Sequence, residues 1–239
     1  MLSLRGEPLF LARWDRVAFL HYESDPDELQ RCVPFPLDLH DGRAFVSLVA
    51  FTMRDMRPRL GGSWGKWLFA PLATHSFLNV RTYVQHRGEP GIYFLAEWLS
   101  SRLATKLGPL TFGLPYRFGA TEYLHQHERN VVQGCVSSKE QGELHYSLDL
   151  PPNISPVPCE QHLLDHFLLE RYTAFTQRGE RQRFFRVWHE PWLQIPAAVH
   201  LHRDDLIATT GSWFRTARCL GGSYSPGVNV WMGRPHRLP

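Results

Sequence analysis

A few polar side chains lie in otherwise apolar segments, and these are the residues that could do chemistry. Arg81 lies in the string FLNVRTYV and Glu97 in IYFLAEW, on the two arms of a hairpin predicted from the turn sequence GEPG. A hairpin places its arms side by side, so we expect Arg81 and Glu97 to lie close together. Such a pair forms a structural ion pair, the simpler interpretation, or orients an anionic ligand.

Two further positions extend this candidate site. Alternation along the first arm puts Tyr83 on the same face as Arg81, opposite an apolar face. His189, in VWHEPW, is either a structural histidine at a strand end or a polar group in a pocket walled by Trp188 and Trp192.

Few side chains of this chain could act as an amine nucleophile, because its 26 basic residues are 23 arginines and only three lysines, Lys66, Lys106 and Lys139. No GxSxG serine motif and no glycine-rich phosphate loop is present. The four cysteines form no CxxC pair, which favours reduced thiols, and nothing distinguishes one of them as a nucleophile.

The histidines give only weak indications of metal binding. His162 and His166 are four residues apart but have apolar neighbours and no HExxH pattern, which favours a pair on a helix surface. His200 and His202 could share a strand face, but no third ligand is evident. We therefore expect neither a metal nor a cofactor.

Length and composition set the broad class. The 239 residues are 43% hydrophobic and carry a net charge of +3, with arginines scattered along the chain, so we expect no nucleic-acid partner. The longest apolar run, residues 67–80, is too short to span a bilayer, and the N-terminus lacks the apolar core of a signal peptide. These features predict a cytoplasmic protein with no membrane partner and leave homo-oligomerisation open.

The elements that must position these residues are mostly strands. Three helices are expected: one that begins after Asp25 and stops at Pro34, one over residues 100–108, and one over residues 159–176 with the strongest helical pattern. Turn signals elsewhere separate short apolar stretches. We predict strands over 14–22, 44–53, 77–87, 92–98, 114–125, 130–138, 143–150, 184–188, 194–202 and 228–233.

Several of these strings resemble, in order and spacing, the YqjF-like family of uncharacterised conserved proteins, which is grouped with the acetoacetate decarboxylase-like superfamily. They are the segment from WDRVAFLHY to AFVSLVAFTM, then FLNVRTYV, GEPGIYF, FGLPYRFGATEY and VWHEPW, spanning roughly residues 10–235. The resemblance implies one α+β, mainly β domain over residues 1–239. It also implies a closed, largely antiparallel β-barrel with a central pocket and two or three peripheral helices.

The resemblance also implies a loss of chemistry. Acetoacetate decarboxylase forms a Schiff base through a lysine in a GFPKK-like segment, which is similar to GLPYR here, so the two lysine positions fall on Tyr116 and Arg117. A phenol forms no imine, and an arginine stays protonated near pH 7. The acid often found just before LNVRT in the family is Phe77 here, and Lys106 is the only lysine near the region.

We therefore expect a small-molecule-binding barrel that lacks the Schiff-base lysine and binds a carboxylate-bearing ligand. The alternative is an enzyme of unknown reaction on a small keto acid or related metabolite, with Tyr116, His189 or Glu97 as acid or base. A third interpretation is a purely structural or partner-binding domain, whose interior would be packed solid with no cavity large enough for a ligand. The expected ligand-binding residues are Arg81, Tyr83, Glu97, Tyr116, Arg117 and His189.

Overall fold

The computed structural model describes residues 8–60, 62–160 and 163–238. Its strands are β1 (Phe10–Ser24), β2 (Ala44–Pro58), β3 (His75–His86), β4 (Glu89–Leu99), β5 (Tyr116–Phe118), β6 (Ala120–Gln126), β7 (Val131–Ser138), β8 (Gly142–Asp149), β9 (Val157–Pro158), β10 (Thr173–Arg178), β11 (Arg181–His189), β12 (Leu193–Arg203), β13 (Arg218–Met232) and β14 (His236–Arg237).

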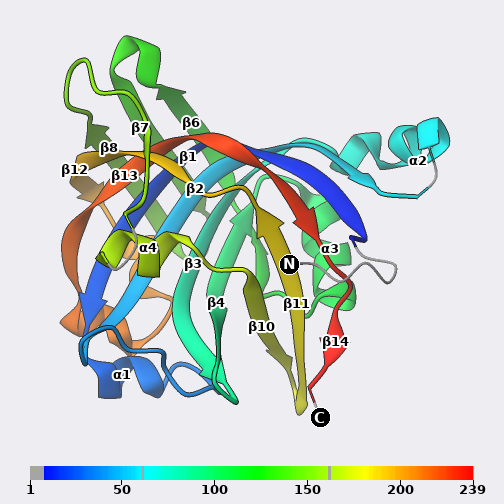
Figure 1. The fold of residues 1–239 in the computed structure, drawn as a ribbon, viewed down its shortest axis with the longest axis horizontal. Helices are drawn as coiled ribbons and strands as arrows, with labels where there is room; N and C mark the ends of the chain where they lie inside the picture. Colours follow the sequence, from blue (N-terminus) through cyan, green and yellow to red (C-terminus); the bar gives the residue numbers. More distant parts are fainter. Residues whose placement is uncertain (1–7, 61, 161–162, 239) are drawn as a thin grey trace.

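The helices are short and lie at the periphery of the strands (Figure 1). They are α1 (Pro26–Gln30), α2 (Gly62–Phe69), α3 (Arg102–Thr111), α4 (Leu164–Leu169) and α5 (Asp205–Ala208), with single 3₁₀ turns η1 (Ala70–Leu72), η2 (His127–Arg129) and η3 (Ser212–Thr216). Within the described residues, none of these helices has the length and apolar character needed to cross a membrane.

The strands form one sheet in the order β14-β11-β10-β4-β3-β2-β1-β13-β12-β8-β7-β6, with β5 beside β4 and β9 beside β12. Neighbours are antiparallel except for β10 with β4 and β4 with β5. Strand β11 also pairs with β13, from Val187–Met232 to His189–Val230. These pairs connect two strands that lie far apart in the strand order. The expected α+β, mainly β fold is confirmed (Figure 1).

The central strands are buried on both faces, as the unbroken apolar run in residues 44–53 indicates. Every residue of β2 from Ala44 to Phe51 is buried. On β3, Leu78 and Val80 belong to the largest core cluster, whereas Phe77 on the opposite face belongs to a second, smaller one. The larger core therefore packs on the face of Leu78 and Val80, and the smaller cluster lies on the face of Phe77.

The hairpin of β3 and β4 contains an irregularity that the sequence did not reveal. The pairing runs regularly from His86–Glu89 to Arg81–Phe94, but the next pair is Val80–Ala96, so Leu95 is an extra residue in β4. A β-bulge of this kind reverses the alternation of side chains beyond it. As a result Phe94 and Glu97 point to the same face, and Glu97 lies opposite Asn79, whereas an unbroken register would place it opposite Leu78.

Several predicted elements differ in extent from the structure. The single strand expected over residues 114–125 is divided into β5 and β6, which pair with different strands. The helix expected over residues 159–176 is limited to α4, because residues 173–178 form β10, which bonds to β11 and β4. Pairing on both sides satisfies the backbone of this segment and overrides its helical periodicity. The final strand is also much longer than residues 228–233, since β13 begins at Arg218 and pairs with nearly all of β1.

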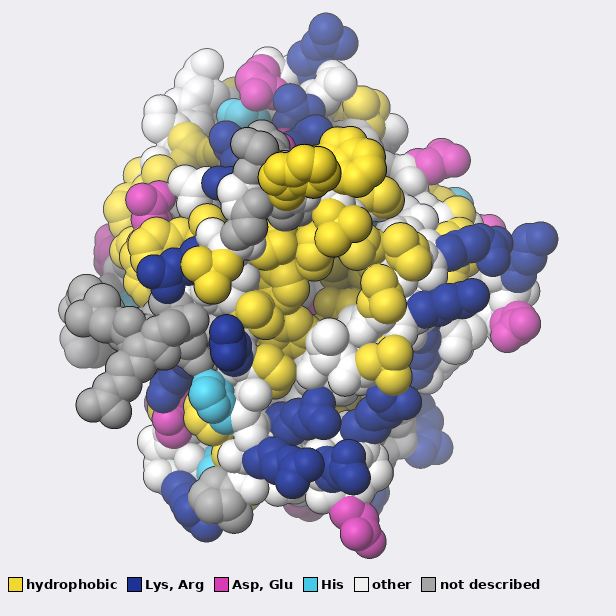
Figure 2. All heavy atoms as spheres, turned by 90° about the vertical axis from the view of Figure 1, so that its right-hand side faces the viewer, with side chains coloured by type: hydrophobic (Ala, Val, Ile, Leu, Met, Phe, Trp, Pro, Cys, Tyr) yellow, Lys and Arg dark blue, Asp and Glu magenta, His cyan; other side chains and the backbone are white. Residues whose placement is uncertain are grey.

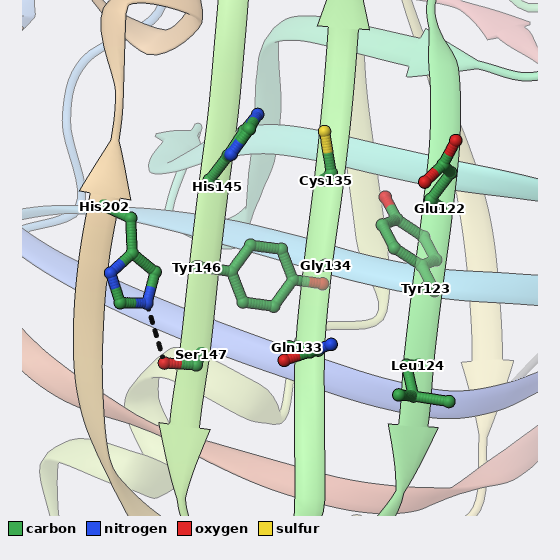
Figure 3. A pocket seen from close by; sticks show the side chains of 10 residues that line it. All are labelled: Glu122, Tyr123, Leu124, Gln133, Gly134, Cys135, His145, Tyr146, Ser147 and His202. Carbon is green, nitrogen blue, oxygen red and sulfur yellow. Dashed lines mark hydrogen bonds between the residues drawn. The ribbon is translucent and has the colours of Figure 1, made fainter.

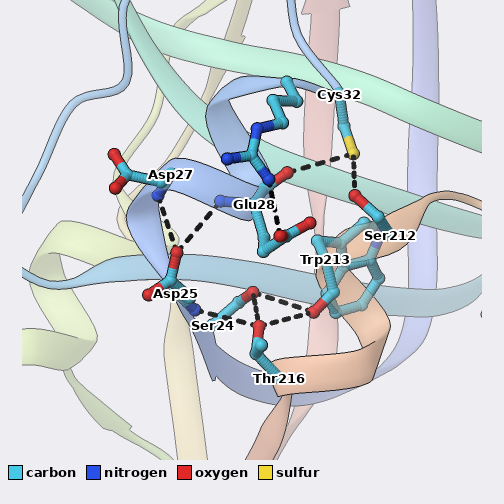
Figure 4. A network of polar contacts seen from close by, with 9 residues as sticks. Ser24, Asp25, Asp27, Glu28, Cys32, Ser212, Trp213 and Thr216 are labelled. Carbon is cyan, nitrogen blue, oxygen red and sulfur yellow. Dashed lines mark hydrogen bonds and ion pairs between the residues drawn. The ribbon is translucent and has the colours of Figure 1, made fainter.

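The start of α1 is as the sequence predicts. Asp25 is the N-cap, and its carboxylate accepts hydrogen bonds from the backbone N–H groups of Asp27 at 2.9 Å and Glu28 at 3.0 Å (Figure 4). Beside it, the Ser24 hydroxyl donates to the carbonyl of Trp213 at 2.9 Å. These bonds tie the end of β1 to η3, nearly two hundred residues later in the chain.

Replacing Asp25 by alanine removes the cap and leaves two N–H groups without their carboxylate partner. We expect Asp25→Ala to lower the free energy of unfolding by about 1 kcal/mol and Asp25→Asn to restore most of that loss, since asparagine caps as well as aspartate. Urea denaturation of the three proteins measures the difference. Equal stability of Asp25→Ala and the parent protein would show that the cap contributes nothing.

Candidate functional site

The second face of the central sheet encloses a cavity of about 260 Å³. Its walls come from β1 to β4, β11 and the end of β13, and α2, η1 and α3 cover it. Most of the lining is aromatic or aliphatic, and Phe51 and Phe77 stack with their ring centres 5.1 Å apart. Polar side chains on this wall therefore lie in apolar surroundings; among them are His75, Asn79, Arg81, Glu97, Tyr116 and Arg171.

Arg81 is the buried cation of the cavity. The residue is only 4% exposed, its Nη2 donates to the carbonyl of Leu168 at 3.1 Å, and its Nε has no partner. Within the described part of the chain no carboxylate forms an ion pair with it. Burial lowers the pKa of this guanidinium, yet an arginine remains charged near pH 7. The cavity therefore contains a guanidinium with no carboxylate in ion-pair contact among the described residues, although the charge of nearby Glu170 favours its protonated form.

Glu97 lies on the same wall without a counter-ion. It is 2% exposed, and its Oε2 has no hydrogen-bond partner among the described residues. Burial raises the pKa of this carboxyl well above its ordinary value. Burial therefore favours the protonated, neutral form of Glu97, and the ion pair with Arg81 that the hairpin suggested does not form within the described residues.

Tyr116 is held beside Glu97 by the short strand β5. The two residues pair directly across the parallel β4–β5 contact, and burial, followed by the nearby Glu97 carboxyl, raises the pKa of the phenol. The ring packs against Gly108 of α3, where a β-carbon would overlap it. A glycine at this position thus allows the phenol ring to lie between the helix and the cavity wall.

The structure adds three polar residues to the wall. His75 and Asn79 continue the Phe77–Arg81 face of β3. Alternation in the sequence already puts Asn79 on the face of Arg81, and extending it to residue 75 could have identified His75. Burial lowers the pKa of His75 to about 4, so its ring is neutral. Arg171 also reaches the cavity, but it pairs with Asp38 at 2.6 Å and adds no free charge.

The other predicted site residues do not line this cavity. The hydroxyl of Tyr83 donates to the carbonyl of Leu168 at 2.9 Å and lies 2.5 Å from Ser47 Oγ. Arg117 lies over the Trp98 ring at 5.3 Å. The His189 ring stacks on Tyr172, and its Nδ1 lies 2.8 Å from the carbonyl of Glu190. Three of the six predicted residues are thus brought together, namely Arg81, Glu97 and Tyr116.

No lysine lines the cavity among the described residues. Lys106 is exposed on α3 and does not line the cavity, whereas Ala104 and Leu107 of the same helix do. Lys139 is exposed in the turn between β7 and β8. His162, singled out with His166 as a weak metal pair, lies outside the described residues.

A more open hollow of about 500 Å³ lies on β6, β7 and β8 (Figure 3). Glu122, Cys135 and His145 follow one another across these three strands, which would suit a cysteine nucleophile beside a base. Burial, however, raises the pKa of the Cys135 thiol. A thiol without a lowered pKa is not activated, so this hollow is the weaker candidate.

The family of uncharacterized conserved proteins named DUF2071 matches residues 11–229. This chain belongs to that family. Uncharacterized protein YqjF of Bacillus subtilis (strain 168) is 29% identical over 184 residues, which are 75% of this chain and 72% of that protein. The resemblance of this DUF2071 chain to YqjF-like proteins is thereby confirmed.

Solved structures of acetoacetate decarboxylase-like proteins share the fold of this DUF2071 chain. An acetoacetate decarboxylase-like enzyme from Sphingomonas wittichii RW1 gives a TM-score of 0.68 at 13% identity, over 97% of this chain and 94% of that one. Acetoacetate decarboxylase from Legionella pneumophila subsp. pneumophila str. Philadelphia 1 gives a TM-score of 0.64 at 13% identity, over 100% of this chain and 92% of that one. The enduracididine biosynthesis enzyme MppR complexed with pyruvate gives a TM-score of 0.65 at 13% identity, over 99% of this chain and 93% of that one.

The raised pKa of Glu97 predicts a specific pH dependence of stability. Above the ordinary carboxyl value of 4.5, the unfolded chain releases this proton while the folded protein keeps it, so the parent loses stability relative to Glu97→Gln as pH rises. We expect the difference to grow by up to about 1.4 kcal/mol per pH unit until the folded carboxyl ionises. Urea unfolding at pH 4, 6 and 8 measures it.

Glu140→Gln, in the exposed turn after β7, is the matched control, and its effect should be small at each pH. A difference between Glu97→Gln and the parent that stays constant from pH 4 to pH 8 would contradict the assignment of Glu97 as a neutral acid.

Proposed function

We propose that this protein binds a small molecule with a carboxylate and an apolar body in the cavity under α2 and α3. The observation that carries the proposal is Arg81, a buried guanidinium with an unpartnered Nε and no carboxylate in ion-pair contact. Burial of an unpaired charge is costly, and an anion delivered by a ligand would offset that cost. A carboxylate is also the group that the fork of an arginine binds with two parallel hydrogen bonds.

The neighbours of Arg81 support an anion rather than a cation. Glu97 carries no charge when protonated, and the charge of Arg171 is matched by Asp38. The net charge facing the cavity is then close to that of Arg81 alone. A protonated Glu97 and the Tyr116 phenol would each donate a hydrogen bond to a ligand oxygen.

The rest of the lining sets the size and character of the ligand. At about 260 Å³ the cavity lies just below the usual range of ligand pockets, roughly 300–1,000 Å³. Its aromatic and aliphatic walls, including Phe51, Phe77 and Phe112, would favour a short apolar chain or ring. A small monocarboxylate fits these limits.

We also propose that the strands enclose this cavity as a closed barrel. The path from β11 through β10, β4, β3, β2 and β1 leads to β13, and the β11–β13 pairs join its two ends. The relatives of like fold include a complex with pyruvate, a small carboxylate. In this chain the absence of a lysine from the described lining supports binding without a Schiff base.

Replacing Arg81 by methionine tests the role of the charge. We expect the parent to bind octanoate about a hundredfold more tightly than octanamide, because only the acid neutralises Arg81, and we expect Arg81→Met to abolish this preference while binding octanamide as before. Isothermal titration calorimetry measures both affinities. Arg117→Met is the control, since this arginine lies outside the cavity.

Circular dichroism and urea denaturation establish that Arg81→Met is folded before its affinities are compared. If the parent binds acid and amide equally, or if Arg81→Met keeps the preference for octanoate, Arg81 is not the carboxylate anchor.

A second candidate function is an enzyme acting on a small keto acid, and the neutral Glu97 is the observation that favours it. A carboxyl with a raised pKa is suited to donate a proton to the carbonyl oxygen of the keto acid while solvent water accepts the proton lost from C3, which gives the neutral enol. Tyr116 is paired beside it on β5, whereas His189 lies outside the cavity. Of the three acid–base residues expected from the sequence, Glu97 and Tyr116 are therefore the better candidates.

The rate of hydrogen–deuterium exchange at C3 of 2-oxooctanoate in D₂O, followed by NMR, tests this activity. If Glu97 is the acid, the protein accelerates the exchange, and Glu97→Gln reduces the acceleration at least a hundredfold. His189→Gln should leave it unchanged, because His189 does not reach the cavity. Exchange at the uncatalysed rate in the presence of the parent protein would eliminate this candidate.

A further inference from the structure

The outer side of α2 and α3 carries an exposed apolar surface, which we call the apolar rim. It consists of Leu60, Trp64, Trp67, Leu68, Leu103, Leu107 and Leu110. These side chains are between 44% and 83% exposed, and Trp64 at 83% and Trp67 at 73% are among the most exposed. Figure 2 shows apolar side chains gathered around a hollow on this side of the molecule. Exposed apolar patches of this kind mark interaction sites.

We propose that the apolar rim docks on the surface of an anionic lipid bilayer. Tryptophan is the side chain most characteristic of the membrane interface, where its ring is half in water and half in hydrocarbon. Helix α2 projects away from the sheet at the edge of the molecule and carries both tryptophans (Figure 1). Surface docking needs no membrane-spanning segment. It departs from the expectation of no membrane partner, which rested on the lack of a spanning run and of a signal peptide in the sequence.

Charge around the rim favours an anionic surface. Residues 56–74, which contain α2, include two arginines and one lysine and no acidic residue. Residues 98–121, which contain α3, likewise include two arginines, one lysine and no acidic residue. Arg178 and Arg183 from the β10–β11 hairpin donate to the carbonyls of Pro109 and Thr111 at 3.0 Å each, which fixes two more cations at the end of α3.

The cations near α3 have no acidic partner within the described residues. Arg102, Lys106, Arg178 and Arg183 form no ion pair there, although Arg102 lies over the Phe118 ring at 4.2 Å. Basic side chains border the apolar ones in Figure 2. Apolar residues bordered by cations match a bilayer whose headgroups are negative.

The same charges argue against a second copy of this chain as the occupant. A two-fold dimer through the rim would place each patch against its own copy. Cations bordering one rim would then face cations bordering the other, and like charges at an interface are unfavourable. Negatively charged phosphate headgroups would instead attract the cations that border the rim.

The rim also surrounds the way into the cavity. Leu107 is 44% exposed and lines the cavity as well, and Phe69 of α2 and Leu72 of η1 line it from the other side. A docked molecule would therefore face the bilayer with the mouth of its cavity. Resting on the proposed function, this geometry suggests that the ligand is an amphiphilic carboxylic acid taken up from the membrane.

Vesicle flotation tests the docking. We expect the parent protein to float with vesicles of equal parts phosphatidylglycerol and phosphatidylcholine and to bind phosphatidylcholine alone at least tenfold more weakly. The double variant Trp64→Ser, Trp67→Ser should lose at least tenfold in partitioning, and so should Arg178→Glu, Arg183→Glu. Leu124→Ser and Arg129→Glu, both exposed and remote from the rim, are the matched controls and should float like the parent.

Failure of the parent to float with anionic vesicles, or equal flotation of the rim and control variants, would overturn the proposal. A parent that is dimeric by analytical ultracentrifugation and monomeric after the tryptophan substitutions would also overturn it and identify the rim as an interface between copies. Octanoate binding without vesicles separates the two proposals: if it persists in the rim variants while docking fails, the cavity proposal stands alone.

Discussion

The pairing of β3 with β4 is the constraint on which the candidate site depends. Strand β3 places alternate residues in a solid core and in the cavity, and its partner must match that division for the whole length of the hairpin. The extra residue Leu95 breaks the match once, so Glu97 joins Phe94 on the cavity side. Without the bulge, the carboxyl would point into the apolar core, where no cavity could supply a partner.

Burial then determines the chemistry of the groups that the hairpin presents. In water, Arg81 and Glu97 would both be charged. Here the carboxyl keeps its proton, while the guanidinium is too basic to lose its own. The same environment thus leaves one positive charge and one neutral acid in a single enclosure. That asymmetry, rather than any one residue, is the basis of the proposed preference for anions.

Much of this architecture could be predicted from the sequence because it depends on local signals. The cap at Asp25, the buried strand β2 and the hairpin turn before β4 each follow from residue types within a few positions. The errors concern non-local pairing. Residues 173–178 have a helical pattern but lie between two strands that hydrogen-bond to their backbone, and the bulge at Leu95 depends on how β4 pairs with β3.

The candidate site was predicted only in part. Three of the six expected site residues reach the cavity, and the tight packing of Tyr83 and His189 elsewhere was not evident from alternation alone.

The scarcity of lysine has a structural counterpart at the cavity. Where the decarboxylase resemblance implies two lysines, Tyr116 occupies the wall and Arg117 turns away over Trp98. Arg81 instead supplies the cavity's one unpaired cation within the described residues, from a different strand. A guanidinium binds an acid without reacting with it, whereas an amine forms a covalent bond with a ketone. The proposed function therefore combines attraction for a carboxylate through Arg81 with the lack of a covalent step.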